Sequence, residues 1–364
     1  MTSLLIGIVG RAPASIVVAA RAFRPDRTLL VHSDDTEDVA KVVQQQLAAS
    51  GLSVPDLTPA DPNRLNATAQ AITDKLTDFQ DTRQLFVDIT GATKPMSIGL
   101  WEGTRGLAAS LPPGGRRAVY LNAAGALLDA DTGEKVPEAE AVIIDPREVI
   151  AWARPEARVV AVWEGSPEEL DEAVRQRAVV WQQLAKALTK GTWRSNVSRP
   201  QRRFLPHRAP ATLPPGFAFK GNGMIEVPLE YLVQNGWLEE LALAEVASAV
   251  RSLAGVRLAL SATVRGRTSG NVELDLVATR GARALVVEAK TMAGSPGQKL
   301  SRKASDVFSL MGPSALLLAF VPSVFGDGPA AKSRADTEAN LGRNGKVCRS
   351  ITHLGALARA HLGA

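Results

Sequence analysis

The chain of 364 residues has little of several residue types, and each scarcity excludes a class of structure or site. A single cysteine, Cys348, excludes an intrachain disulfide and a zinc cluster of cysteines, and it favours a reducing compartment. Four histidines are too few to favour a histidine-based metal site. The apolar run Ala315 to Val321 is too short to cross a bilayer, and the chain begins without the pattern of a signal peptide. We therefore expect a soluble, cytoplasmic protein without membrane association.

Hydrophobic residues make up 45% of the chain, enough for real cores in the two or three domains that its length suggests. A net charge of +5 favours polyanionic partners without identifying one. Between Lys190 and Arg208, basic residues without any acidic ones are interleaved with Trp193, Phe204 and His207. Such a stripe suits a nucleic-acid backbone with stacked bases, and the alternative is an arginine-rich linker in a proline-containing loop. The residues that we expect to contact nucleic acid are Arg194, Arg199, Arg202 and Arg203.

The run ELDLVATRGARALVVEAK, which begins at Glu273, predicts a β-hairpin. Its two halves are apolar and β-branched or alternating, and Arg280 to Arg283 reads as a turn whose two-residue loop has glycine first. Counting outward from that loop sets Asp275 opposite Glu288 and Glu273 opposite Lys290. All four side chains then share one face of the hairpin.

Opposed carboxylates such as Asp275 and Glu288 destabilise an exposed strand pair by up to roughly 1 kcal/mol. A hard divalent cation offsets that repulsion, because Mg²⁺ takes oxygen ligands from one or two carboxylates and keeps waters. Lys290 lies on the same face and suits a role in orienting or deprotonating water. The alternative is a solvated charged face with an ion pair between Glu273 and Lys290.

A helix is predicted to begin at Gly236, because the apolar residues of LEELALAEVASAV recur at helical spacing. We expect this helix to be amphipathic. Glu239 and Glu240 lie in its first turn, where the helix dipole favours a carboxylate whatever its function.

A helix glutamate, a strand aspartate and the triplet Glu288-Ala289-Lys290 together resemble the PD-(D/E)xK nuclease fold, over residues 235–319. In that fold the three groups converge on a metal ion. The proline-aspartate pair of the name is absent from this chain. The resemblance favours Glu239 over Glu240, because motifs of the fold place an apolar residue before the acid. The implied catalytic residues are Glu239, Asp275, Glu288 and Lys290, and the implied ligands of Mg²⁺ or Mn²⁺ are Asp275, Glu288 and the Ala289 carbonyl.

The N-terminal part alternates short apolar runs with helical segments, which predicts a doubly wound α/β domain with a mostly parallel sheet. The expected strands are 4–9, 28–32, 84–89, 119–122 and 142–144, and the expected helices are 14–23, 36–50 and 70–78. Ligands of such sheets bind outside the carboxyl ends of the strands. Two loops follow such ends, Gly10 to Pro13 and Thr90 to Ser97. The second has glycine, hydroxyls, a lysine and a helix start, which suit phosphate, although it lacks the P-loop spacing.

The segment DITGATKPMSIG, Asp88 to Gly99, resembles the D-x-T-G-G-T-K-x-M signature of CARF domains, with Ala92 in place of the second glycine. CARF domains sense cyclic oligoadenylate in type III CRISPR defence. A CARF domain joined to a PD-(D/E)xK domain in a chain of this length resembles the stand-alone CRISPR ancillary nucleases that cyclic tetra-adenylate activates. Further matches are Gly236 to Glu239 and Lys299-Leu300 leading to Leu310 to Pro313.

This resemblance implies a homodimer that binds one cyclic ligand on the dimer axis, so that ligand binding shifts the arrangement of the nuclease domains. The residues implied to face the ligand are Gly10, Arg11, Ala12, Thr90, Gly91, Ala92, Thr93, Lys94 and Met96.

The expected fold class is therefore α/β, with an N-terminal doubly wound Rossmann-like CARF domain and a C-terminal α/β PD-(D/E)xK restriction-endonuclease-like domain. The expected boundaries are 1–150 for the sensor, 151–216 for a helical and basic linker, and 217–364 for the nuclease. The expected function is a ligand-gated, metal-dependent endonuclease acting on DNA, with RNA as a second candidate substrate. A ligand-responsive nucleic-acid-binding regulator without catalysis is the alternative. A HEPN ribonuclease motif fits Arg202 to His207 as a string, but the surrounding prolines disfavour the helix that it needs.

Overall fold

The computed structural model describes residues 2–55, 57–91, 93–154, 157–161, 163–172, 174–176, 178–179, 181–182, 193–195, 218–219, 225–227, 236–265, 271–289, 297–311, 315–320, 341, 345–348 and 350–363. The chain divides into two compact units. The first unit comprises residues 1–157, 280–283 and 309–314, and the second comprises 158–279, 284–308 and 315–364. The first unit thus extends past the predicted boundary at residue 150, because α6 (Pro146–Ala153) packs against α2 (Glu37–Ala49).

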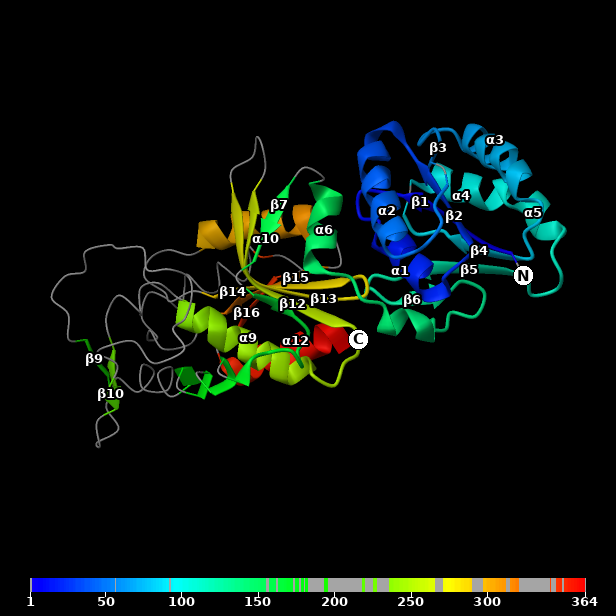
Figure 1. Ribbon diagram of the computed structural model, residues 1–364. Helices are drawn as coiled ribbons and strands as arrows, with labels where there is room; N and C mark the ends of the chain where they lie inside the picture. The colour runs from blue at the N-terminus through cyan, green and yellow to red at the C-terminus, as the bar shows by residue number, and fades with distance from the viewer. Residues whose placement is uncertain are drawn as a thin grey trace. The chain divides into compact units, whose positions relative to one another are not determined.

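The first unit is built on a sheet in the order β3-β2-β1-β4-β5-β6 (Figure 1). Its strands are β1 (Ser3–Val9), β2 (Arg27–His32), β3 (Leu57–Pro59), β4 (Gln84–Asp88), β5 (Arg116–Leu121) and β6 (Leu127–Asp129). The first five are parallel, and β6 pairs antiparallel with β5. The chain moves outward from β1 through β2 to β3 and then returns to the other side of β1 with β4. The gap between β1 and β4 is therefore the topological switch point of the sheet.

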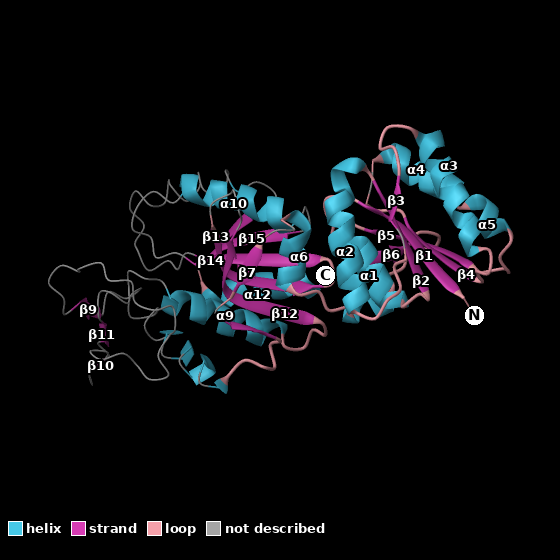
Figure 2. Ribbon diagram, turned by 45° about the horizontal axis from the view of Figure 1, so that its top comes forward, coloured by secondary structure: helices cyan, strands magenta, loops and turns pink. Residues whose placement is uncertain are grey.

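Helices cover both faces of this sheet, as the doubly wound prediction requires (Figure 2). On one face lie α1 (Ala14–Phe23) and α2, and on the other lie α3 (Leu65–Leu76), α4 (Lys94–Gly103) and α5 (Arg105–Ala109). Short 3-10 turns occupy Asp34–Thr36, Thr77–Phe79 and Pro137–Ala141. The second face buries Leu4, Ile6 and Ile8 of β1 against α3, α4 and α5, as the period of two in a strand predicts.

One predicted strand of the first unit is wrong. Residues 142–144 have no strand structure and link the last 3-10 turn to α6. Val142 and Ile144 are buried, which accounts for the apolar run. The Ile143 carbonyl accepts a hydrogen bond from Arg21 at 2.6 Å. Asp145 and Pro146 then start α6 with a capping box, so the apolar run ends in a helix N-terminus.

The second unit contains a sheet in the order β16-β15-β14-β13-β12-β7, with β8 also paired to β12 (Figure 1). Its strands are β7 (Arg158–Val160), β8 (Trp163–Gly165), β12 (Val256–Arg265), β13 (Val272–Arg280), β14 (Arg283–Ala289), β15 (Ala315–Phe320) and β16 (Gly345–Cys348). Both β7 and β8 run antiparallel to β12. Strands β7 and β8, which lie in the expected linker, therefore form the edge of this sheet. Sequence periodicity missed them because each strand is only three residues long.

Helices also cover both faces of the second sheet. Figures 1 and 2 show α10 (Gly297–Met311) on one face, and α9 (Gly236–Val250) with α12 (Ile351–Gly363) on the other. The chain passes from β14 through α10 to β15, which pairs parallel with β14. The expected amphipathic character of α9 is wrong, since residues around most of its circumference are buried. They are Trp237, Leu238, Glu240, Leu241, Ala242, Leu243, Val246, Ala247 and Val250.

A small three-stranded sheet completes the described residues of the second unit. It joins β9 (Trp193–Ser195), β10 (Ala218–Phe219) and β11 (Ile225–Val227) in the order β10-β11-β9. Within the described ranges, no helix combines the length and the hydropathy needed to cross a membrane.

Candidate functional site

The two predicted sensor loops meet at the switch point between β1 and β4. A Cβ atom added to Gly10 would lie 2.1 Å from the Gly91 carbonyl oxygen, and one added to Gly91 would lie 2.4 Å from the Ile8 carbonyl oxygen. The loops therefore touch backbone to backbone, and only glycine fits at either position. The predicted need for glycine in the second loop arises from its contact with the first loop.

A buried carboxylate fixes the second loop. Asp88 ends β4 with no exposed surface, and its Oδ1 accepts hydrogen bonds from the Thr90 backbone N–H at 3.1 Å and the Thr90 hydroxyl at 2.6 Å. Thr90 Oγ1 in turn accepts from the Leu121 N–H at 2.8 Å, which ties the loop to β5. Burial raises the pKa of Asp88, and the hydrogen bonds from Thr90 oppose that rise. The Thr90 hydroxyl thus serves the loop itself in this structure.

The remaining predicted sensor residues differ in exposure. Arg11 and Lys94 are exposed, and Lys94 opens α4 directly after Thr93. The Thr93 hydroxyl donates to the Pro62 carbonyl at 2.6 Å. Met96 is 3% exposed and packs in the core under α4, so its side chain presents no surface to a ligand in this arrangement. Ala92 lies outside the described residues.

The predicted hairpin is present in the second unit as β13 and β14. The strands are separated by two residues, and Gly281 at the first of them has φ of 53°, the left-handed value expected for a turn with glycine first. Asp275 is 4% exposed and Glu288 is 5% exposed. The pair is therefore buried, in contrast to the alternative interpretation of a solvated charged face.

Both carboxylates have partners inside the protein. Asp275 Oδ2 accepts the Ala289 backbone N–H at 2.8 Å, which connects β13 to the triplet on β14. Lys303 of α10 places its Nζ 2.9 Å from Glu288 Oε2 and also donates to the Glu273 carbonyl oxygen. Lys290, expected on the same face, lies outside the described residues. The spacing around the E-x-K triplet carries no signal for Lys303, because only the crossover through α10 brings this lysine to the strands.

The two helix glutamates point to different partners. Glu239 Oε2 accepts a hydrogen bond from the Ser261 hydroxyl of β12 at 2.7 Å. Ser261 has φ of 49°, which is strained for a residue with a side chain and fits a position held by its surroundings. Glu240 is 3% exposed and accepts the Trp181 indole N–H at 2.7 Å. Glu240 is therefore buried against Trp181, whereas Glu239 is half-buried and bonded to β12, and the choice of Glu239 as the catalytic glutamate stays a prediction.

Asp275 and Glu288 suit a hard cation, because carboxylate and carbonyl oxygens are the ligands that Mg²⁺ and Mn²⁺ prefer. Among the described residues, no group of three or more His, Cys, Asp or Glu side chains is arranged to hold a metal ion. A cation between the two strands would therefore depend on this carboxylate pair and on other oxygens such as the Ala289 carbonyl or water.

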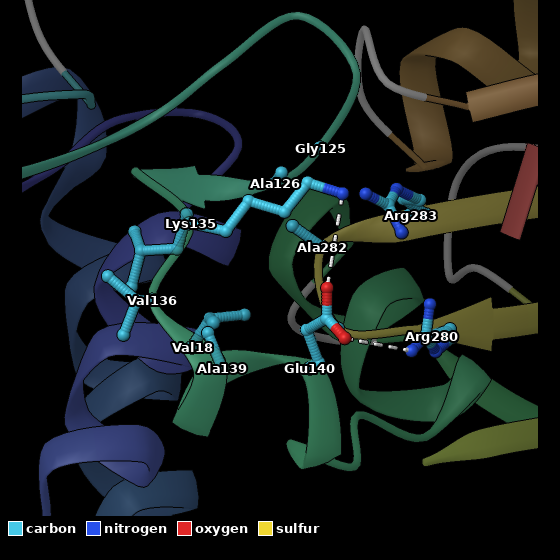
Figure 3. A pocket seen from close by; sticks show the side chains of 12 residues that line it. Val18, Gly125, Ala126, Lys135, Val136, Ala139, Glu140, Arg280, Ala282 and Arg283 are labelled. Atoms are coloured by element: carbon cyan, nitrogen blue, oxygen red, sulfur yellow. Dashed lines mark ion pairs between the residues drawn. The ribbon is translucent and has the colours of Figure 1, made fainter. Parts of the chain in front are cut away.

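The turn residues Arg280–Arg283 belong to the first unit and line a small pocket with Lys135 and Glu140 (Figure 3). The Glu140 carboxylate lies 4.0 Å from Lys135 Nζ and 3.8 Å from an Arg280 nitrogen. Arg283 donates to the Ala124 carbonyl at 2.7 Å, and burial lowers the pKa of its guanidinium. The charged groups of this pocket contact one another and the backbone, and we assign no ligand to it.

Most of the predicted basic stripe, including Arg199, Arg202 and Arg203, lies outside the described residues. Arg194 is part of β9, where the described structure is limited to the backbone pairing with β11. The stripe and the HEPN-like string at Arg202 to His207 therefore stay sequence predictions.

The fold defines a class of protein, namely a doubly wound α/β domain followed by a mixed α/β domain with a β12-β13-β14 core. Two solved structures share this fold over nearly the whole chain. One is Can2 from Sulfobacillus thermosulfidooxidans in complex with cyclic tetra-adenylate, at 13% identity and a TM-score of 0.64, with 99% of this chain and 97% of that chain covered. The other is protein VC1899 from Vibrio cholerae, at 15% identity and a TM-score of 0.68, with 99% and 98% covered.

A third structure is a type III CRISPR defence DNA nuclease activated by cyclic oligoadenylate. It is 16% identical with a TM-score of 0.60, and the match covers 88% of this chain but 45% of that one. No protein-family model and no curated protein matches the sequence. The comparisons confirm the two-domain α/β fold expected from the resemblance to CARF nucleases.

Proposed function

We propose that this protein is a type III CRISPR ancillary effector, a metal-dependent endonuclease that a cyclic oligoadenylate activates. The observation that carries the nuclease assignment is the buried pair Asp275 and Glu288 on neighbouring strands. Burial of two carboxylates on neighbouring strands is costly unless cations balance them. Lys303 supplies one positive charge beside Glu288, and a divalent cation would balance both carboxylates, so the arrangement favours a cation site. The same fold in a DNA nuclease activated by cyclic oligoadenylate supports the assignment.

In the proposed reaction, Asp275, Glu288 and the Ala289 carbonyl would hold Mg²⁺ or Mn²⁺. When bound, the cation supplies Lewis-acid polarisation of the phosphodiester and a more acidic water. The Ala289 N–H fixes the Asp275 carboxylate, and Ser261 fixes Glu239 at the helix start. Lys290 orients the attacking water, with Glu273 as its ion-pair partner. DNA is the proposed substrate, with RNA as the second candidate, and Arg194, Arg199, Arg202 and Arg203 are the proposed contacts to its backbone.

The proposed activator is cyclic tetra-adenylate, bound by the loops at the β1 and β4 switch point in a homodimer. The exposed Arg11 and Lys94 supply positive charge for its phosphates, and the N-terminus of α4 adds backbone N–H groups. Can2 has the same fold and was solved with cyclic tetra-adenylate, which supports this choice of ligand. Activation requires only that the ligand bind the active arrangement more tightly than the idle one.

A single preparation of the full chain tests both parts. Supercoiled plasmid, single-stranded DNA and RNA are incubated with Mn²⁺, with and without cyclic tetra-adenylate, beside Asp275→Ala and Lys290→Ala. We expect cutting that requires the ligand and that falls at least about a hundredfold in Asp275→Ala, since even outer partners of metal ligands cost 10–100-fold. Asp131→Ala, an exposed aspartate in a turn of the first unit, is the matched control and should cut normally.

Cutting without the ligand would contradict the gating, and undiminished cutting by both active-site variants would contradict the residue assignment. A regulator without catalysis would instead retain a labelled duplex in a mobility-shift assay, leave it intact, and bind it equally well in EDTA.

A further inference from the structure

Lys303 is a basic residue that the E-x-K motif does not include, yet it contacts both strands of the candidate metal site. Its ammonium lies 2.9 Å from Glu288 Oε2 on β14 and donates to the Glu273 carbonyl oxygen on β13. α10 holds the lysine there as it crosses from β14 to β15. The contact therefore depends on the packing of α10 over the sheet and could not be found from the spacing of residues around the triplet.

This ion pair differs from the surface pairs of the chain in its burial. The Lys303 side chain is 16% exposed and that of Glu288 is 6% exposed. For Lys75 and Asp78 on the first unit, the corresponding values are 26% and 60%. An exposed pair has little influence on stability, whereas a buried carboxylate that loses its cation is left with an uncompensated charge.

The side-chain chemistry of lysine suits a counter-ion that a divalent cation can replace. Its ammonium is a compact point charge on a flexible stem, and it lacks the planar fork with which arginine clamps a carboxylate through two hydrogen bonds. Asp275 is already bound by the Ala289 N–H, so Glu288 is the carboxylate of the pair that Lys303 neutralises. A divalent cation at the same carboxylates would supply more charge to the same oxygens.

We propose that Lys303 is a positioning residue that serves as the counter-cation of Glu288 in the metal-free protein and gives up this carboxylate when the divalent cation binds. The inference rests on the proposed function, because it assumes that Asp275 and Glu288 hold the metal. Lys303 then has two opposing effects. It keeps the carboxylates in place before metal arrives, and it weakens metal binding because its contact with Glu288 must be broken first.

The test measures Mn²⁺ binding by isothermal titration calorimetry, and melting temperature in EDTA and in Mg²⁺, on the full chain without nucleic acid or activator. Lys303→Met keeps the stem and removes the charge. We expect it to bind Mn²⁺ roughly tenfold more tightly, equivalent to about 1.4 kcal/mol, while melting at a lower temperature in EDTA. The rise in melting temperature on adding Mg²⁺ should be larger than in the unmodified protein. Lys303→Arg keeps the charge and should restore melting in EDTA, and Lys75→Met is the matched control with an exposed ion pair.

Lys303→Met that binds Mn²⁺ and melts in EDTA like the unmodified protein would overturn the inference. Should Lys303→Met fail to fold in EDTA, the double variant Glu288→Gln with Lys303→Met should fold, because removing both partners of this ion pair leaves neither of its two charges buried alone. A double variant that also fails would overturn the inference as well. Asp275→Asn distinguishes failure of the role of Lys303 from failure of the proposed metal site. If it abolishes Mn²⁺ binding while Lys303→Met changes nothing, only the role of Lys303 is refuted; if the unmodified protein binds no Mn²⁺, the proposed metal site and this inference both fall.

Discussion

The candidate site of the first unit exposes its charges, whereas that of the second unit buries them. Arg11 and Lys94 are exposed around two loops that touch through Gly10 and Gly91. In the second unit, Asp275 and Glu288 are buried. Asp275 accepts a hydrogen bond from the Ala289 backbone N–H, and Glu288 forms an ion pair with Lys303. The first candidate site therefore combines loops in backbone contact with exposed cations. The second is a set of anions that already have partners before any ligand arrives.

This difference predicts different responses to substitution. In the first unit, backbone contacts set the shape of the site, so a single added methyl group can disrupt it while charge removal acts in a graded manner. In the second unit the buried charges are energetically coupled, so removing one charge changes the free-energy cost of burying its partner.

Gly10→Ala should abolish activation by the cyclic ligand. The added Cβ would lie 2.1 Å from the Gly91 carbonyl oxygen, so the two loops must separate. We expect loss of labelled-ligand binding and a stability decrease of about 1–3 kcal/mol, measured by filter binding and by denaturant unfolding. Gly106→Ala is the matched control, because a Cβ there meets no atom within 4 Å and the residue lies in α5. That variant should bind the ligand normally, and an equal loss in both variants would contradict the backbone-contact argument.

Lys94→Ala should weaken ligand binding in a graded and salt-dependent way. Lys94 is exposed at the start of α4, so its removal leaves the fold intact and deletes one charged contact with phosphate. A hydrogen bond to a charged group contributes about 1.5–3 kcal/mol, which predicts a loss of at least roughly tenfold in affinity. Titrations at two salt concentrations should show a shallower salt dependence in the variant. Unchanged affinity with unchanged salt dependence would remove Lys94 from the site.

The same contrast explains which features could be predicted from the sequence. The hairpin of β13 and β14 is defined by a two-residue turn within one continuous segment, so the hairpin itself could be predicted, and the opposition of Asp275 and Glu288 stays a prediction from counting. The loop after β4 is likewise local. Lys303 and Ser261 belong to elements that meet the site only through packing, and short-range periodicity holds no information about such contacts. For α9, the helical spacing was visible, but burial of Trp237 and Ala242 on further faces depends on both α12 and the sheet.

Ser261→Ala should slow cutting moderately. The substitution removes the hydroxyl that donates a hydrogen bond to Glu239 Oε2 at 2.7 Å and orients that carboxylate. We expect roughly a tenfold lower rate of ligand-activated plasmid cutting, as for other groups that orient an active-site side chain. Ser261→Gly removes the same hydroxyl and also accepts φ of 49° without strain, so it should be about 1 kcal/mol more stable than Ser261→Ala at a similar rate. A rate equal to that of the unmodified protein in both variants would show that Glu239 needs no orientation by Ser261.

The two units surround a buried carboxylate with different partners. Asp88 Oδ1 accepts two hydrogen bonds from Thr90, whereas Glu288 has the ammonium of Lys303 beside it. Because burial raises the folded-state pKa of Asp88 above its ordinary value of 3.8, the folded protein binds the proton more strongly than the unfolded chain does. This group therefore lowers stability as pH rises from 3.8 through its folded pKa, and the full penalty is present at higher pH.

Asp88→Asn removes the charge and keeps an oxygen that can accept the two Thr90 hydrogen bonds. We expect it to melt above the unmodified protein at neutral pH and to lose this advantage in buffers near pH 3.8, with ligand affinity retained. Glu288→Gln should instead melt below the unmodified protein at neutral pH in metal-free buffer, because it leaves Lys303 largely buried without its anionic partner. Melting curves of both variants across the same pH series decide the comparison. If Asp88→Asn is instead the less stable variant at neutral pH, then the hydrogen bonds from Thr90 need the charged acceptor, and the first unit depends on a buried anion as much as the second.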